Sequence, residues 1–201
     1  AGTGMNVQQT NLDVISNNIA NVNTNGYKKS RADFQDLMYQ TLGLQGARTE
    51  GGGMIPTGVQ IGLGAMLSSV QKVFQQGDYQ NTGNELDVAI EGNGFFQINL
   101  PSGDKAYTRS GAFKTDADGK LVTSDGYTLE PNLTIPAKTT SISIESDGTV
   151  TVQIQGQTTA QQLGKITLAN FMNPTGLRAI GKNLFMETDA SGSPTTGQPG
   201  Q

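Results

Sequence analysis

The first part of the chain carries apolar side chains at helical spacing. They recur every three or four positions, as on the seam of a coiled coil. The stripe consists of Met5, Gln8, Leu12, Ile15, Ile19 and Val22, with Gln8 as its one polar member. We predict an amphipathic helix that ends in the turn from Asn21 to Gly26. An isolated helix of this length is marginal in water, so it needs a partner that covers the stripe.

A second apolar pattern with helical spacing spans Ser30 to Leu42. Its members, which share one helical face, are Phe34, Leu37, Met38 and Leu42. We predict a short second helix over this range, stopped by Gly43. Residues 43–64 are dense in glycine and contain one proline, so they are expected to form a linker or a loop that a partner orders.

From about Met66 onward, apolar and polar positions alternate, which is the period of a half-buried strand. Turn signals separate the short runs: Pro101-Ser102-Gly103, Asp118-Gly119, Asp125-Gly126 and Asp147-Gly148. The clearest hairpin surrounds Asp147-Gly148, where isoleucine and valine alternate on both sides. The predicted fold class is mainly β: an antiparallel β sandwich or distorted barrel, with an N-terminal helical segment and a glycine-rich linker.

Four segments follow from these patterns. We expect an N-terminal helical assembly segment at residues 1–42, a glycine-rich linker at 43–65, a β-rich domain at 66–189 and a mobile tail at 190–201. The apolar stripe has two interpretations. It contacts another subunit, or it packs on the chain's own β domain, and the long glycine-rich separation favours the first.

The composition excludes several classes of function. The 201-residue chain has no histidine and no cysteine, which removes the usual general base near neutral pH and the thiolate nucleophile. The formal net charge of −4 provides no broad cationic field for nucleic acid or anionic lipid. We expect no enzymatic activity, no nucleic-acid partner and no membrane insertion.

Three short motifs are candidates for chemistry, and each has a simpler interpretation. Gly92-Asn93-Gly94 lacks the third glycine, the helix and the lysine of a phosphate-binding loop. Asp116 to Gly119 begins like a calcium loop, but no glutamate closes it. Carboxylate pairs such as Asp87 with Glu91 are close in sequence and rarely face each other across a glycosidase cleft. We predict no catalytic residue, no cofactor and no metal site.

Two blocks of sequence resemble a known family. Asn17 to Phe34 reads NNIANVNTNGYKKSRADF, an asparagine-rich helix end that runs into Gly-aromatic-Lys. The second block is LDVAIEGNGFFQI from Leu86 to Ile98, followed by AYTRSGAFKTDADGKLVTSDGYTL from Ala106 to Leu129. Both are similar to the flagellar basal-body rod and hook protein family, and together they cover most of the chain expected to be ordered.

Within this family, two further segments are most similar to the distal rod members. They are DLMYQT at Asp36 to Thr41 and IPTGVQIGLG at Ile55 to Gly64. The resemblance also implies that the glycine-rich segment contacts neighbouring subunits and straightens the shaft. The family pattern extends before Ala1 and beyond Gln201, so a longer protein truncated at both ends is expected, with a C-terminal helix that pairs with the N-terminal one.

The resemblance implies a structural subunit of the bacterial flagellum. Such a protein is exported by the flagellar type III system and self-assembles helically into a rigid tube, the periplasm-spanning rod that transmits torque from motor to hook. Its expected partners are further copies of itself, neighbouring rod and hook proteins and the surrounding basal-body rings. The alternatives are a hook or proximal rod protein and, from another class, an extracellular carbohydrate-binding β domain.

The predicted assembly interface combines the apolar stripe with residues that the resemblance adds at the helix end, in the Gly-aromatic-Lys motif and in the glycine-rich segment. It comprises Met5, Leu12, Ile15, Ile19, Val22, Asn18, Asn21, Gly26, Tyr27, Gly51, Gly52 and Gly53.

Overall fold

A computed structural model describes residues 2–43 and 58–199. The chain divides into two compact units. Unit 1 comprises Ala1–Val22 and Lys29–Val73, and unit 2 comprises Asn23–Lys28 and Phe74–Gln201. The chain therefore crosses between the units at 22/23, at 28/29 and at 73/74. This division differs from the expected boundaries, because strand pairing groups the residues on both sides of the glycine-rich segment into one unit.

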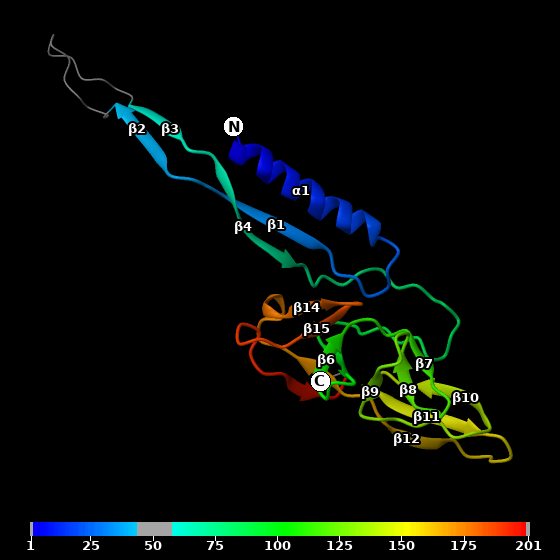
Figure 1. Cartoon of the computed structure of the whole chain (residues 1–201). Helices are drawn as coiled ribbons and strands as arrows, with labels where there is room; N and C mark the ends of the chain where they lie inside the picture. The colour runs from blue at the N-terminus through cyan, green and yellow to red at the C-terminus, as the bar shows by residue number, and fades with distance from the viewer. Residues whose placement is uncertain (1, 44–57, 200–201) are drawn as a thin grey trace, which may run out of the picture. The chain divides into compact units, whose positions relative to one another are not determined.

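Unit 1 consists of one helix and a long antiparallel hairpin (Figure 1). Helix α1 spans Gly2–Ala20 and contacts strands β1 and β4. The strands of the hairpin are β1 (Ser30–Asp36), β2 (Tyr39–Gly43), β3 (Val59–Gly62) and β4 (Ala65–Lys72). Strand β1 pairs with β4, and β2 pairs with β3. The N–H group of Leu37 donates to the carbonyl of Gly64 at 2.8 Å, which joins the two ladders.

The prediction of a second helix over Ser30 to Leu42 is wrong. This range forms strands β1 and β2, whose backbone groups pair with β4 and β3. A helix this short would have been marginal in water, whereas the hairpin satisfies the backbone groups and α1 covers part of it. Strand β3 also lies within the predicted linker, and residues 44–57 of that linker lie outside the described residues.

Unit 2 is built from two antiparallel sheets. The larger has nine strands and the smaller three. In the larger sheet the main order is β14-β15-β6-β5-β9-β8-β7, and β13 pairs with both β5 and β16. Its strands are β5 (Phe95–Asn99), β6 (Lys105–Thr108), β7 (Phe113–Thr115), β8 (Leu121–Thr123), β9 (Thr128–Glu130), β13 (Leu168–Asn170), β14 (Arg178–Gly181), β15 (Leu184–Met186) and β16 (Thr195–Gly197). The smaller sheet contains β10 (Thr139–Ile144), β11 (Thr149–Ile154) and β12 (Gln161–Lys165).

The core of unit 2 has two hydrophobic clusters. The first joins both sheets, because Val150 of β11 packs with Phe96, Ile98 and Leu129 of the larger sheet. The second is aromatic and contains Phe95, Tyr107, Phe171 and Phe185. Its rings meet edge to face, for example Tyr107 with Phe171 at 4.8 Å between centroids. The expectation of a mainly β chain with antiparallel sheets and one N-terminal helix is confirmed.

The segment predicted to be a mobile tail contains regular structure. Strand β16 pairs with β13, from Leu168↔Gly197 to Asn170↔Thr195. Ser191 is buried, and its hydroxyl donates to the carbonyl of Thr188 at 2.8 Å. The composition suggested mobility because it offers little apolar surface, but backbone pairing with an existing sheet does not need apolar side chains.

The predicted hairpin at Asp147-Gly148 joins β10 and β11. Asp147 accepts hydrogen bonds from the N–H group of Thr149 at 2.9 Å and from its hydroxyl at 2.8 Å. Lys165 of β12 forms an ion pair with the same carboxylate at 2.7 Å. The hydrogen bonds from Lys165 and Thr149 hold the pKa of Asp147 well below its ordinary value of 3.8.

Lowering the pH is expected to reduce the stability of unit 2 more in the wild type than in the Asp147→Asn variant. The pKa of Asp147 is lower in the folded chain than in the unfolded one, so its contribution is present above about pH 4 and is lost as the pH falls below that value. Thermal unfolding midpoints measured from about pH 6 to about pH 2 check this. Parallel curves for the two proteins would show that the carboxylate contributes nothing in the folded state.

Candidate assembly surface

The apolar stripe, which runs along α1 and ends at Val22 in the turn after the helix, is exposed along its whole length. Its five apolar members keep large fractions of their surface in solvent: Met5 69%, Leu12 62%, Ile15 44%, Ile19 66% and Val22 75%. Side chains of this kind are usually buried in globular proteins. The exposed stripe is therefore a candidate surface for contact with another protein.

A different face of α1 lies against the hairpin of unit 1. The half-buried residues of the helix are Val7, Thr10, Asn11, Val14 and Asn18. At about 100° per residue, this set is centred roughly 120° away from the stripe around the helix axis. The helix thus packs on its own strands without using the stripe. The stripe is therefore not buried on the strands of unit 1, and its contact with another subunit stays a prediction.

Two of the predicted interface residues make hydrogen bonds within unit 1. Asn18 joins α1 to β1, since its Nδ2 donates to the carbonyl of Ser30 at 2.8 Å and its Oδ1 accepts from the N–H group of Ser30 at 2.9 Å. Asn21 closes the helix end, with its Nδ2 donating to the carbonyl of Asn17 at 2.9 Å. A contact of Asn18 or Asn21 with another subunit stays a prediction.

Unit 1 has no buried hydrophobic residue among those that the structure describes. Every core residue in the described part of the chain lies in unit 2, between Ile90 and Phe185. Of the seventeen large apolar side chains that the described residues leave exposed, fourteen belong to unit 1. A helix on a two-stranded ribbon without a core is not expected to be stable alone, so unit 1 needs further surfaces to cover it.

The ribbon of β2 and β3 adds apolar surface that the sequence-based prediction missed. Val59, Ile61 and Leu63 follow one another at alternate positions, so they share one face, and all three are exposed. On the other face, Tyr39 lies over Gly62, whose missing side chain leaves room for the ring. The alternation in VQIGLG was the available signal, but the surrounding glycines favoured the interpretation as a linker.

The remaining predicted interface residues lie in different places. Gly26, in unit 2, has a φ of 72°, and a Cβ there would lie 2.8 Å from the backbone of Ser110, so no side chain fits. Tyr27 is half-buried, and its N–H group donates to the carbonyl of Thr24 at 3.2 Å. Gly51, Gly52 and Gly53 lie outside the described residues, and their role stays a prediction.

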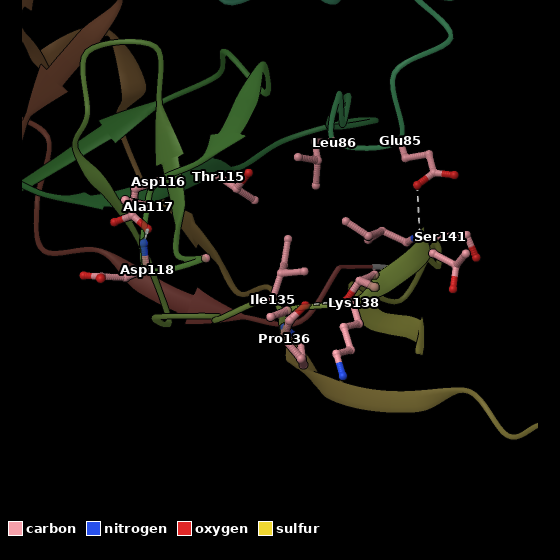
Figure 2. A pocket seen from close by; sticks show the side chains of 15 residues that line it. Glu85, Leu86, Thr115, Asp116, Ala117, Asp118, Ile135, Pro136, Lys138 and Ser141 are labelled. Carbon is pink, nitrogen blue, oxygen red and sulfur yellow. Dashed lines mark hydrogen bonds between the residues drawn. The ribbon is translucent and has the colours of Figure 1, made fainter. Parts of the chain in front are cut away.

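Unit 2 also has a surface pocket of about 420 Å³, shown in Figure 2. Its carboxylates are engaged in the local structure. Glu85 accepts a hydrogen bond from the N–H group of Ile142 at 2.8 Å, drawn as the dashed line, and Asp116 accepts from the N–H groups of Asp118 and Lys120. The lining contains no aromatic ring on which a sugar could stack. The pocket therefore gives no support to the carbohydrate-binding alternative.

Within residues 2–43 and 58–199, no group of three or more acidic, histidine or cysteine side chains is placed to hold a metal ion. No described helix is both long enough and apolar enough to cross a membrane.

Two family profiles match parts of the chain. The family described as flagella basal body rod protein matches residues 1–28, and the D1 domain of the flagellar hook proteins FlgE/F/G matches residues 89–152. The flagellar basal-body rod protein FlgG of Caulobacter vibrioides is 50% identical over 202 residues, which cover 100% of this chain and 77% of the relative. The corresponding protein of Borreliella burgdorferi is 46% identical over 202 residues, covering 100% and 76%. The chain belongs to the FlgG family of flagellar basal-body rod proteins.

Membership of the FlgG family confirms the resemblance to flagellar rod and hook proteins. FlgG is a structural component of the flagellar basal-body rod and not an enzyme, so membership implies assembly within that rod. The flagellar hook protein FlgE of Helicobacter mustelae is also similar, at 47% identity over 129 residues. That match covers 64% of this chain and only 28% of the hook protein.

Proposed function

We propose that this chain is the assembling part of a distal rod subunit and that copies of it form a rigid helical tube that transmits torque from motor to hook. The observation that carries this proposal is the exposed apolar stripe of α1. In the tube, the stripes of neighbouring subunits cover one another, in the manner of coiled-coil seams. Unit 1 would thereby gain the hydrophobic core that its described residues lack within one chain.

Burial of the stripe supplies the driving force for assembly. Fully burying one aliphatic side chain is worth about 1.5–3 kcal/mol. The five apolar stripe residues are between 44% and 75% exposed in the single chain. Covering them therefore stabilises the contact by roughly 5–10 kcal/mol per helix, before the entropic cost of association. The same contact recurs between successive subunits of a helical tube, so this stabilising free energy adds up along the tube.

Unit 2 forms the outer body of the proposed subunit. It contains both hydrophobic clusters and joins its two sheets through one of them, so it has the core needed to stay folded without neighbours. A close-packed core of this kind has low compressibility and transmits strain, which suits a part that must resist torque. Neighbouring rod and hook proteins and the basal-body rings are the proposed further partners, and the flagellar type III system the proposed export route.

The hook protein is the nearest alternative. It is less well supported, because the match to FlgE of Helicobacter mustelae covers 64% of this chain whereas the match to FlgG of Caulobacter vibrioides covers all of it. A proximal rod protein is a second alternative from the same class.

Electron microscopy of basal bodies from cells that lack this gene separates these possibilities. We expect shortened rods without hooks, together with loss of motility. Complete rods that lack only hooks would identify a hook protein instead, and normal swimming would reject the flagellar function altogether. Restoring the gene should restore full-length rods, which controls for effects on neighbouring genes.

A further inference from the structure

Helix α1 places its less apolar face on the hairpin of unit 1. The half-buried residues on that face are valine, threonine and asparagine, whereas the stripe of larger apolar side chains stays exposed. Amphipathic helices normally bury their most apolar face. Strand β4 offers apolar partners of its own, since Met66, Leu67 and Val70 are exposed. Turning α1 by about 120° around its axis would let the stripe pack on the ribbon. A directional interaction is therefore needed to hold the observed orientation.

The side chain of Asn18 provides such an interaction. It bonds both backbone groups of Ser30, the first residue of β1, with the donor and acceptor distances of 2.8 and 2.9 Å given above. This pair of bonds has the pattern that two opposed residues exchange in an antiparallel ladder. Hydrogen bonds weaken steeply as their angles depart from linearity. A rotation of the helix would break both bonds at once, and both lie in a part-buried position.

A second close contact lies at the other end of α1. Gly64, between β3 and β4, has a φ of 118°, and a Cβ there would overlap the side-chain oxygen of Thr3. Only glycine lets the helix approach the ribbon this closely. Thr3 and Asn18 lie about four turns apart, within roughly 60° of each other around the helix axis. Contacts at both ends of one face fix the rotation of the helix as well as its position.

We infer that Asn18 is a positioning residue that, together with the close approach of Thr3 to Gly64, fixes the rotation of α1 and keeps the apolar stripe exposed. The inference concerns unit 1 of a single chain, and only the use of the exposed stripe by neighbouring subunits rests on the proposed function. Asn18 thus acts on assembly from within its own chain. Without its two hydrogen bonds, the stripe turns onto the ribbon and the chain loses its assembly surface while keeping every side chain of the stripe.

Thiol labelling of the single chain tests this role, because a chain without cysteine accepts one reporter at a chosen position. Ile15→Cys places the reporter on the exposed stripe, and Val14→Cys places it on the half-buried face. We expect the Ile15→Cys chain to react with a maleimide roughly fivefold faster than the Val14→Cys chain. Adding Asn18→Ala should reverse this order, because the stripe becomes covered and the opposite face becomes exposed.

Each other result of the labelling experiment overturns the inference. An unchanged ratio of rates in Asn18→Ala shows that the amide does not set the rotation. A similar rise of both rates shows that the helix detaches without turning, and equal rates before Asn18 is changed show that the helix is not held at all.

Asn6→Ala is the matched control for Asn18→Ala. It removes the same amide from an exposed position of α1, so both rates should stay as they were. A reversal in this control as well would assign the effect to any change in the helix and reject the specific role of Asn18. The basal-body experiment is independent, since it can reject the flagellar function while the labelling result stands.

Discussion

Replacing both Ile15 and Ile19 by aspartate is expected to abolish rod assembly while unit 2 stays folded. Both side chains belong to the exposed stripe of α1, so the change costs the single chain little. In the assembled tube, each carboxylate would be buried against apolar neighbours, which costs several kcal/mol per unpaired charge. The cost of burying two such charges is of the same order as the roughly 5–10 kcal/mol that covering the stripe provides, so the contact is no longer favourable. Basal bodies from cells that produce the variant should lack complete rods, and circular dichroism should still show the β structure of unit 2.

The chain offers a matched control for this experiment. Asn6 and Ala20 lie one heptad before and one heptad after Asp13, and all three are exposed on a third face of α1. This face already carries a carboxylate, so Asn6→Asp with Ala20→Asp adds the same charge without burying it. We expect normal rods from this variant. Normal rods from the stripe variant, or an equal loss in both, would contradict the role assigned to the stripe.

The sequence was sufficient for α1 because helical periodicity is a local signal. The spacing of Met5, Leu12 and Ile19 places them on one face whatever surrounds the helix. The same local rule failed at Phe34 to Leu42, where the residues that decide the structure are the pairing partners within and beyond the glycine-rich segment. Phe34 pairs across the hairpin with Leu67, and no local pattern distinguishes that pairing from a helix face. Local periodicity reports which residues share a face, and it does not report which partner they meet.

The contact between the two sequence blocks could not be predicted for a related reason. Gly26 stood out in the N-terminal motif, and its φ of 72° agrees with the turn predicted there. The need for glycine comes equally from Ser110, a residue far along the chain in the second block. The hydrogen bond from Nδ2 of Asn183 to the carbonyl of Asn25 also depends on how the strands of unit 2 are arranged, and the sequence alone gives no indication of that arrangement. Both blocks were recognised as motifs, but their contact is a property of the fold.

Truncation of Phe96 is expected to be the most destabilising single change in unit 2. Its ring is 2% exposed, and it meets Phe113 edge to face at 5.0 Å in the cluster that joins the two sheets. Removing a buried phenylalanine typically costs about 3–5 kcal/mol. That is a large part of the roughly 5–15 kcal/mol that stabilises a typical domain, so Phe96→Ala should lower the urea midpoint strongly or unfold unit 2 at room temperature. Loss of this cluster would detach the smaller sheet from the larger one.

Met172→Ala is the matched control, because Met172 is a large apolar residue of the same unit that is 95% exposed. Its truncation leaves no cavity and should change the free energy of unfolding by no more than about 0.5 kcal/mol. Urea unfolding followed by circular dichroism compares the two variants. A similar change in both would mean that the core of unit 2 does not provide its stability. Unit 2 would then depend on neighbours as unit 1 does, and a rod built from it would owe its rigidity to subunit contacts alone.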